Sequence, residues 1–156
     1  KDVIISIQAV DRAGRVITIP ANKVLFEYRN NNLSDDLIFL SASFKVKKDN
    51  KIRIEKEIIK LKNKKNNNQP TKLKTSGSTF KNPINQTTKK VWELIKVSVP
   101  LNTSFGDACI SKKHSNFFIN KKNASFKDMM SLIEFVKLNV KKKTGIKLEK
   151  EIKIIE

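Results

Sequence analysis

Nine consecutive residues near the middle of the chain, 75–83, combine hydroxyl groups, a cation and an amide in the order Thr-Ser-Gly-Ser-Thr-Phe-Lys-Asn-Pro. Gly77 permits a turn or a close approach to a ligand, Pro83 ends the stretch, and Phe80 offers one apolar anchor to a core. Ser78 would then be presented rather than buried, and we interpret the stretch as a reaction site. The same composition is typical of an ordinary surface loop, so both interpretations stand on these residues alone.

Other side chains offer chemistry elsewhere in the chain. Tyr28 and Arg29 place a phenol beside a cation at the mouth of an expected loop, although such a neighbouring pair is usually a surface pair. Glu151 falls on an expected strand, which can hold a catalytic acid rigidly, although most such carboxylates are simply solvated. His114 is the only histidine, and with Cys109 as the only cysteine it cannot make a zinc site, so we expect no metal.

The charge of the chain is strongly positive, because 33 basic residues stand against 15 acidic ones and give a formal net charge of +18. Such a balance can indicate a basic nucleic-acid-binding module, which remains the alternative function. Phosphate-recognising proteins favour arginine for its forked geometry, whereas lysine dominates here and is spread over every segment. We therefore favour a solvated basic surface, or attraction of an anionic small molecule, and expect no nucleic-acid partner.

The single Cys109 excludes an internal disulfide and fits a reducing compartment, and its apolar neighbours favour burial of the thiol. No apolar run approaches the roughly 20 residues that span a bilayer, and no signal-peptide pattern opens the chain. We expect a soluble, cytoplasmic protein without a membrane partner. Lys1 and Asp2 lead directly into an apolar run, so we also expect the chain to be the C-terminal part of a longer protein.

The first third of the chain predicts a small sheet. Residues 3–10 and 16–19 have the composition of two strands in a hairpin, and Pro20 ends the second. Asn22 can cap a short helical turn that reaches residue 26. Residues 37–46 start apolar and then alternate, as expected of a strand that passes from a covered region to a sheet with one wet face and closes this sheet.

The remaining residues predict helices separated by short strands. A charged helix over 51–65 carries a narrow apolar stripe of Ile54, Ile58 and Leu61, and the polar run 66–70 ends it. After the stretch 75–83 we expect a helix capped by Thr87 or Thr88, with Val91, Trp92, Leu94 and Ile95 facing inward, and then strands at 105–110 and 116–120. A second helix should open with a capping box at 125–128, carry Met129, Ile133, Val136 and Val140 along one stripe, and end at Gly145. A last strand is expected at 148–155. The fold class is therefore α+β.

Four stretches of the chain, in this order, carry a family resemblance. They are Phe-Glu-Tyr-Arg-Asn at 26–30, Gly-Ser-Thr-Phe-Lys-Asn-Pro at 77–83, Gly-Asp-Ala at 106–108 through His-Ser-Asn-Phe at 114–117, and Gly-Ile-Lys-Leu-Glu-Lys-Glu-Ile at 145–152. Together they resemble the UDP-N-acetylenolpyruvoylglucosamine reductases, also called UDP-N-acetylmuramate dehydrogenases. These are flavoenzymes of peptidoglycan precursor synthesis.

This resemblance implies roles for particular residues. Ser78 would donate a proton to the substrate carbon next to the carboxylate, with Arg29 and Glu151 as its catalytic companions. In this family NADPH reduces FAD, and the flavin passes a hydride to the enolpyruvyl double bond of a UDP-sugar. The positions that match substrate-contacting residues or their neighbours are Tyr28, Lys81, Asn82 and His114.

The resemblance also implies how the chain is divided. Residues 1–50 would be the C-terminal part of an FAD-binding domain, and 51–156 a connecting helix and a small mixed α/β substrate-binding domain. The main FAD segment, with its glycine-rich pyrophosphate loop, would precede Lys1, so the chain alone would be inactive. The full-length enzyme is expected to be monomeric. The departures from the family pattern are Lys153, a cofactor-contacting position where arginine is common, and Asp107 and Glu156, where glycine is common.

Overall fold

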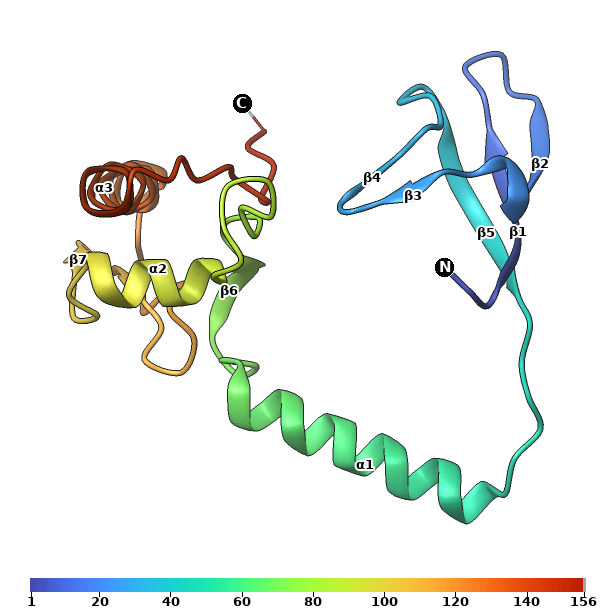
Figure 1. The fold of residues 1–156 in the computed structure, drawn as a ribbon, viewed down its shortest axis with the longest axis horizontal. Coiled ribbons are helices and arrows are strands. Elements are labelled where there is room, and N and C mark those ends of the chain that lie inside the picture. The colour runs from blue at the N-terminus through green and yellow to red at the C-terminus, as the bar shows by residue number, and fades with distance from the viewer. Residues whose placement is uncertain (156) are drawn as a thin grey trace. The chain divides into compact units, whose positions relative to one another are not determined.

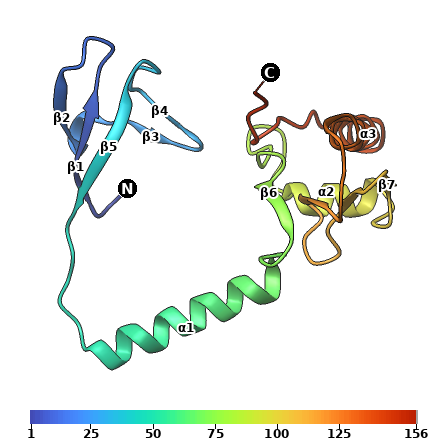
Figure 2. The ribbon, with the colours of Figure 1, turned by 180° about the vertical axis from the view of Figure 1, so that it is seen from behind.

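The computed structural model describes residues 1–155, and the departure at Glu156 lies outside the described residues. The chain divides into two compact units, Lys1–Ile54 and Glu55–Glu156, which are coloured from blue to green and from green to red in Figure 1 and are seen from behind in Figure 2. The described residues contain α-helices together with separate antiparallel sheets, which confirms the α+β class.

The first unit is built on a three-stranded antiparallel sheet in the order β2-β1-β5 (Figure 1). Both the hairpin and the closing third strand were expected from the sequence and are present. The apolar start of β5 was expected to be covered, yet Ile38, Phe39 and Leu40 are 51–65% exposed. The strands are β1 (Ile4–Val10), β2 (Val16–Pro20) and β5 (Ile38–Phe44).

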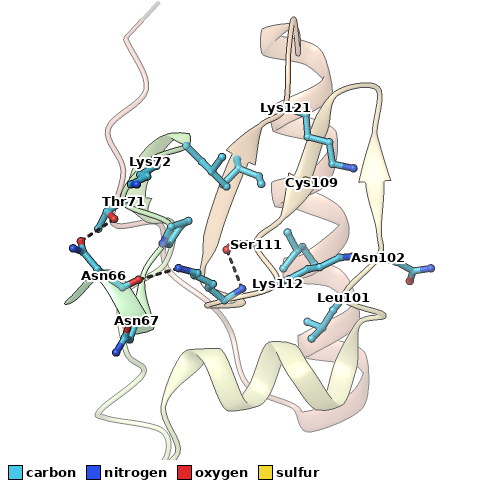
Figure 3. Close-up of a pocket in the computed structure, with 15 residues that line it drawn as sticks. Asn66, Asn67, Thr71, Lys72, Leu101, Asn102, Cys109, Ser111, Lys112 and Lys121 are labelled. Carbon is cyan, nitrogen blue, oxygen red and sulfur yellow. Dashed lines mark hydrogen bonds between the residues drawn. The ribbon is translucent and has the colours of Figure 1, made fainter. Parts of the chain in front are cut away.

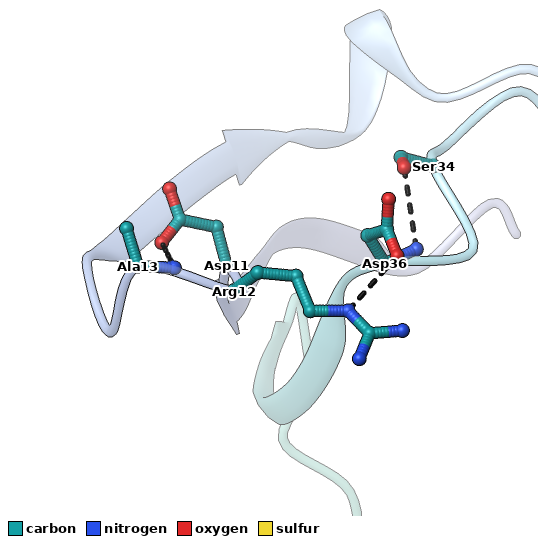
Figure 4. A network of polar contacts seen from close by, with 5 residues as sticks. All are labelled: Asp11, Arg12, Ala13, Ser34 and Asp36. Carbon is teal, nitrogen blue, oxygen red and sulfur yellow. Dashed lines mark hydrogen bonds and ion pairs between the residues drawn. The ribbon is translucent and has the colours of Figure 1, made fainter.

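Side chains hold the turns of this sheet (Figure 4). The Asp11 carboxylate accepts hydrogen bonds from the backbone N–H groups of Ala13 at 2.9 Å and Arg15 at 3.0 Å, and the bonds from Arg15 are the main cause that lowers the pKa of Asp11. Arg12 donates from Nε to Asp36 at 2.9 Å. The β1–β2 turn therefore satisfies its own backbone donors and is tied to the loop that precedes β5.

The helical turn is shorter than the sequence predicted, because it does not reach residue 26. A 3₁₀ turn, η1 (Ala21–Lys23), follows Pro20, and Val24 is already extended. The amide oxygen of Asn32 accepts from the N–H of Leu25 at 2.7 Å, and this bond joins the two arms of a small hairpin. Its strands are β3 (Phe26–Glu27) and β4 (Asn30–Asn31).

The helix α1 (Lys51–Asn68) runs further than expected. The asparagine run was expected to be a solvated turn, but it continues the helix as far as the segment before Pro70, whose ring disfavours helical backbone at the preceding residue. The apolar stripe of Ile54, Ile58 and Leu61 is exposed, as is most of the helix surface. Among the described residues, no helix has both the length and the hydropathy that a bilayer crossing requires.

The second unit has a four-stranded antiparallel sheet in the order β6-β9-β8-β7, with two helices packed together on one of its faces. The core between sheet and helices contains Phe80, Leu94, Phe118, Ile133 and Val136, each at most 2% exposed. The elements are β6 (Lys74–Ser78), α2 (Val91–Ser98), β7 (Ser104–Phe105), β8 (Ala108–Ile110), β9 (Phe117–Asn120) and α3 (Phe126–Thr144).

Three local expectations in this unit are wrong. The stretch that begins at residue 75 is not a loop at first, because β6 continues to Ser78. The helix α2 starts after Lys90 and not at Thr87 or Thr88, since the Glu93 carboxylate accepts from the Lys90 N–H at 2.7 Å, and Trp92 is 37% exposed instead of facing inward. Residues 148–155 form no regular strand and contribute one isolated bridge, between Phe80 and Lys150.

The helix α3 has the ends that the sequence predicts. The Ser125 hydroxyl accepts from the Asp128 N–H at 3.1 Å, and the Asp128 carboxylate accepts from the Ser125 N–H at 2.9 Å. This reciprocal cap lowers the pKa of Asp128. Gly145 ends the helix in the left-handed conformation with φ of 76°. The thiol of Cys109 is buried as expected, and burial raises its pKa.

We expect Gly106→Ala to destabilise this unit more than Gly145→Ala. Both glycines have positive φ, so either alanine costs about 1–2 kcal/mol in backbone strain. Only at Gly106 does a Cβ meet a neighbour, the Asp128 carboxylate at 2.7 Å, and moving that carboxylate disrupts the cap of α3. Thermal unfolding of the full-length protein, followed by circular dichroism, measures the difference. Equal losses for the two variants would contradict this explanation.

Candidate active site

Ser78 is the last residue of β6 and pairs with Phe117 of β9. The register of this pairing shifts between Thr75 and Ser78, where Gly77 takes a φ of 88° and the Thr75 hydroxyl accepts from the Gly77 N–H at 3.2 Å. An L-residue adopts that backbone conformation only with strain. The irregularity at Gly77 therefore ends the strand and leaves the Ser78 side chain half-buried, at the point where the chain leaves the sheet.

The backbone after Ser78 is held by the C-terminal segment. The Glu151 N–H donates to the carbonyl of Thr79 at 2.8 Å, and the Lys81 N–H donates to the carbonyl of Glu149 at 2.9 Å. Thr79 is 1% exposed, so this pairing takes place inside the unit. The structure thus brings Glu151 next to the residue that follows Ser78, and two of the predicted catalytic residues lie on adjacent backbone segments.

The cation and the amide of the same stretch have defined partners. Lys81 forms an ion pair with the exposed carboxylate of Glu149. The side-chain oxygen of Asn82 accepts from the Val91 N–H at 3.1 Å and so ties the stretch to the first residue of α2. Lys81 and Asn82, both predicted to contact the substrate, therefore lie on the same fixed segment as Ser78.

His114 lies beside the strand residue that pairs with Ser78. Its ring meets that of Phe117 edge-on, with centroids 4.8 Å apart, and its Nδ1 accepts from the Asn116 N–H at 3.3 Å. Burial, followed by the charge of Lys96, lowers the pKa of His114 below its ordinary value of 6.5. The imidazole is therefore neutral at pH 7 and offers a hydrogen-bonding group without a charge.

In the first unit, Tyr28 and Arg29 form the turn between β3 and β4. Arg29 has a φ of 59° and is the one non-glycine residue with positive φ in the described part of the chain. Such a conformation costs of order 1–3 kcal/mol and occurs where neighbouring structure, often at a functional site, imposes it. The Arg29 guanidinium carbon lies 5.1 Å from the centre of the Tyr28 ring, so the predicted phenol and cation do form a pair.

A pocket of about 710 Å³ lies in the second unit, between the end of α1 and the sheet face opposite α2 and α3 (Figure 3). Buried Cys109, Ile110 and Ser111 contribute to its floor, and the lining residues include lysines but no acidic side chain. Lys113 is fixed at the rim by its ammonium group, which donates to the carbonyl of Asn66 at 2.9 Å. The lining lysines are Lys72, Lys112, Lys113 and Lys121. A pocket of this size and charge suits an anionic small molecule.

Two features of this region escaped sequence reasoning. None of the predicted site residues lines the pocket. From the sequence, its lysines were interpreted as general surface charge. The lysine doublet at 112–113, directly after an expected strand, was the sequence feature that could have indicated this basic pocket. Asn116 was placed in an expected strand and in one of the four stretches of the resemblance but was given no role, yet its buried side chain bonds to both backbone groups of Phe80. Lys153 is exposed at the end of the C-terminal segment, outside the pairing with Thr79.

Residues 69–155 match the family described as UDP-N-acetylenolpyruvoylglucosamine reductase, C-terminal domain. The chain belongs to this family. The match includes Ser78, Lys81, Asn82, His114 and Glu151, and so covers the stretch of β6 and the C-terminal segment that holds it. The residues predicted in the first unit precede the matched range.

Proteins named UDP-N-acetylenolpyruvoylglucosamine reductase are similar to the whole chain. The protein from Pelagibacter ubique (strain HTCC1062) is 70% identical over 156 residues, which are 100% of this chain and 52% of that protein. The protein from Rickettsia conorii is 40% identical over 99% of this chain and 52% of its own length. The crystal structure of the reductase from Thermus caldophilus has a TM-score of 0.79 at 26% identity and covers 97% of this chain and 53% of that one. The chain thus spans about half the length of the relatives it matches.

Proposed function

We propose that this chain is the C-terminal part of an NADPH- and FAD-dependent reductase that converts UDP-N-acetylglucosamine enolpyruvate to UDP-N-acetylmuramate in peptidoglycan synthesis. The observation that carries the proposal is the backbone hydrogen bond of 2.8 Å from the Glu151 N–H to the Thr79 carbonyl, which places the backbone of Glu151 beside the segment of Ser78. Family membership supports the substrate class. Residues 1–50 are assigned to the flavin-binding domain and 51–156 to the connecting helix and the substrate-binding domain.

In this proposal Ser78 donates a proton to the substrate carbon next to the carboxylate. A serine hydroxyl is a weak acid, so its contribution depends on being held in place, and Glu151 is assigned to that positioning. Arg29 is assigned to the substrate carboxylate, because a forked guanidinium can bind both oxygens as negative charge spreads onto them. Tyr28, Lys81, Asn82 and His114 are assigned to the UDP-sugar.

The lysine-lined pocket supports an anionic substrate. The pocket is lined by four lysines and by no acidic residue. The lysines are Lys72, Lys112, Lys113 and Lys121. A concentration of like charge around a concave surface raises the local concentration of anions and their rate of encounter. We therefore assign to these lysines the attraction of the UDP-sugar, and we propose a cytoplasmic, monomeric enzyme without a nucleic-acid partner.

The residues described here do not fit the main FAD site. Gly14 and Gly106 lie in turns, Gly77 in β6 and Gly145 at the end of α3, so none of the glycines lies in a loop that leads from a strand into a helix and could receive a pyrophosphate. When bound, FAD reduced by NADPH supplies the hydride. We assign its main binding segment to the part of the full-length protein that precedes Lys1, and Lys153 to a cofactor contact in this chain.

The full-length protein and the chain alone together test this proposal. The purified full-length protein should bind FAD and oxidise NADPH when the enolpyruvyl UDP-sugar is present, with formation of UDP-N-acetylmuramate followed by mass spectrometry. The chain alone should hold FAD weakly or not at all and show no NADPH oxidation. A full-length protein that forms no product, or a chain that purifies with stoichiometric FAD, would contradict the assignment.

A further inference from the structure

The side chain of Asn116 takes the place of a strand residue beside the segment that follows Ser78. The β6–β9 pairing ends at Ser78 and Phe117, because the chain before Phe117 turns away and the Phe117 N–H donates to the carbonyl of His114. Phe80 therefore lacks a backbone partner on this side. The Asn116 amide provides both missing bonds: its oxygen accepts from the Phe80 N–H at 3.0 Å and its nitrogen donates to the Phe80 carbonyl at 2.9 Å.

The same residue also holds Thr79 through its backbone. The Thr79 N–H donates to the carbonyl of Asn116 at 2.8 Å, while the opposite edge of this segment is bonded to the segment of Glu149 and Glu151. Asn116 is 3% exposed and Phe80 is 1% exposed, so water does not compete freely for these bonds. The segment is thus fixed on one edge by Asn116 and on the other by the C-terminal segment.

We propose that Asn116 is a positioning residue: it holds Thr79 and Phe80, which follow Ser78 and pair with the segment of Glu151, and so fixes the backbones of Ser78 and Glu151 relative to each other. This inference rests on the proposed function, since it gives Ser78 the role of proton donor. Asn116 acts through Thr79 and Phe80 and is not assigned any contact with substrate. A small displacement of a positioned acid is enough to slow the step that it serves.

Truncation of two asparagines in the full-length enzyme tests the role of Asn116. Asn120 is the matched control, because it lies in β9 and its side chain also bonds to backbone groups, accepting from Ala124 N–H at 2.9 Å and Lys122 N–H at 3.1 Å, in a turn away from Ser78. Asn116→Ala should slow reoxidation of the reduced flavin by the enolpyruvyl substrate about 10- to 100-fold, with flavin reduction by NADPH unchanged. Asn120→Ala should leave both half-reactions near the wild-type rates.

Asn116→Asp provides a readout that does not depend on truncation. Its carboxylate accepts from the Phe80 N–H but cannot donate to the Phe80 carbonyl, whereas the protonated acid can do both. Burial raises the pKa of such a carboxyl group. The reoxidation rate of Asn116→Asp relative to wild type should therefore recover as the pH is lowered, and the ratio for Asn120→Asp should not.

The outcomes separate the inference from the proposed function. If the wild-type enzyme fails to reduce the enolpyruvyl substrate, the proposed function is overturned and this inference with it. If the wild-type enzyme is active and Asn116→Ala matches Asn120→Ala in reoxidation, only the inference is overturned. If Asn116→Ala fails to fold, the test is the pH dependence of Asn116→Asp. The inference about Asn116 is then overturned if the reoxidation rate of Asn116→Asp, relative to wild type, does not recover at low pH.

Discussion

Replacing Ser78 by alanine should slow reoxidation of the flavin by the enolpyruvyl substrate by about 10²–10⁴-fold, while flavin reduction by NADPH proceeds at nearly the wild-type rate. The two half-reactions differ because only the second requires a proton at the substrate carbon. The left-handed Gly77 and the bonds to Thr79 hold the backbone on both sides of Ser78, so loss of one half-buried hydroxyl should not displace the segment.

A stopped-flow experiment in two parts measures this effect in the full-length enzyme. Flavin bleaching by NADPH is recorded first, and its reoxidation by the enolpyruvyl substrate second. Ser76→Ala is the matched control, because it removes an exposed hydroxyl from the same strand two positions earlier and should alter neither rate. If the flavin of Ser78→Ala is reoxidised at the wild-type rate, Ser78 is not the proton donor and the stretch 75–83 is an ordinary surface segment.

The sequence predicted those elements whose signals are local. The capping box of Ser125 and Asp128 and the left-handed Gly145 set both ends of α3, and the side chains that determine these ends are only a few residues away from them. Phe80 was predicted as the core anchor of its stretch and is 1% exposed. These features depend on short-range hydrogen bonds and on one large apolar side chain, which a single sequence displays directly.

The elements that were wrong depend on partners far along the chain or on competition between weak preferences. The residues of β6 have the composition of a loop, and they become a strand because Thr75 and Ser78 pair with β9. The alternating residues after Leu148 suggested a strand, but their pairing is limited to the short segment beside Phe80. The asparagine run continues α1 because Pro70, and not the run itself, stops the helix.

The candidate site divides in the same way. The resemblance identified Ser78 and Glu151, and the structure adds that their backbone segments are adjacent, which no spacing along the chain reveals. The role of Asn116 could not be found from the sequence, because an asparagine in an expected strand gives no sign of its partner until its amide is seen to pair with Phe80. The sequence therefore identifies the chemical groups, and the fold determines where they lie relative to one another.

The variant Arg29→Gly should lose most of its activity without a large loss of stability. Its φ of 59° costs an arginine of order 1–3 kcal/mol, and glycine removes that strain. Glycine also gains freedom in the unfolded chain, worth about 0.5–1 kcal/mol, and Arg29→Gly loses the cation–π contact with Tyr28, worth about 0.5–1 kcal/mol at an exposed site. On these ranges Arg29→Gly should lie between about 1 kcal/mol less stable and about 2 kcal/mol more stable than wild type.

The effect on activity should be much larger, because removal of one group that stabilises developing negative charge typically costs about 10²–10³-fold in rate. We expect Arg29→Gly to lose at least this much in the reoxidation step. Arg29→Lys should also be slow, since an ammonium group cannot reproduce the two parallel hydrogen bonds of a guanidinium to a carboxylate. Arg12→Lys is the matched control, because Arg12 is an exposed arginine of the same unit that pairs with Asp36 (Figure 4). Thermal unfolding and stopped-flow reoxidation are measured on all three variants. A normal reoxidation rate for Arg29→Lys would remove Arg29 from the proposed chemistry, and the left-handed turn would then be a structural feature of the β3–β4 hairpin alone.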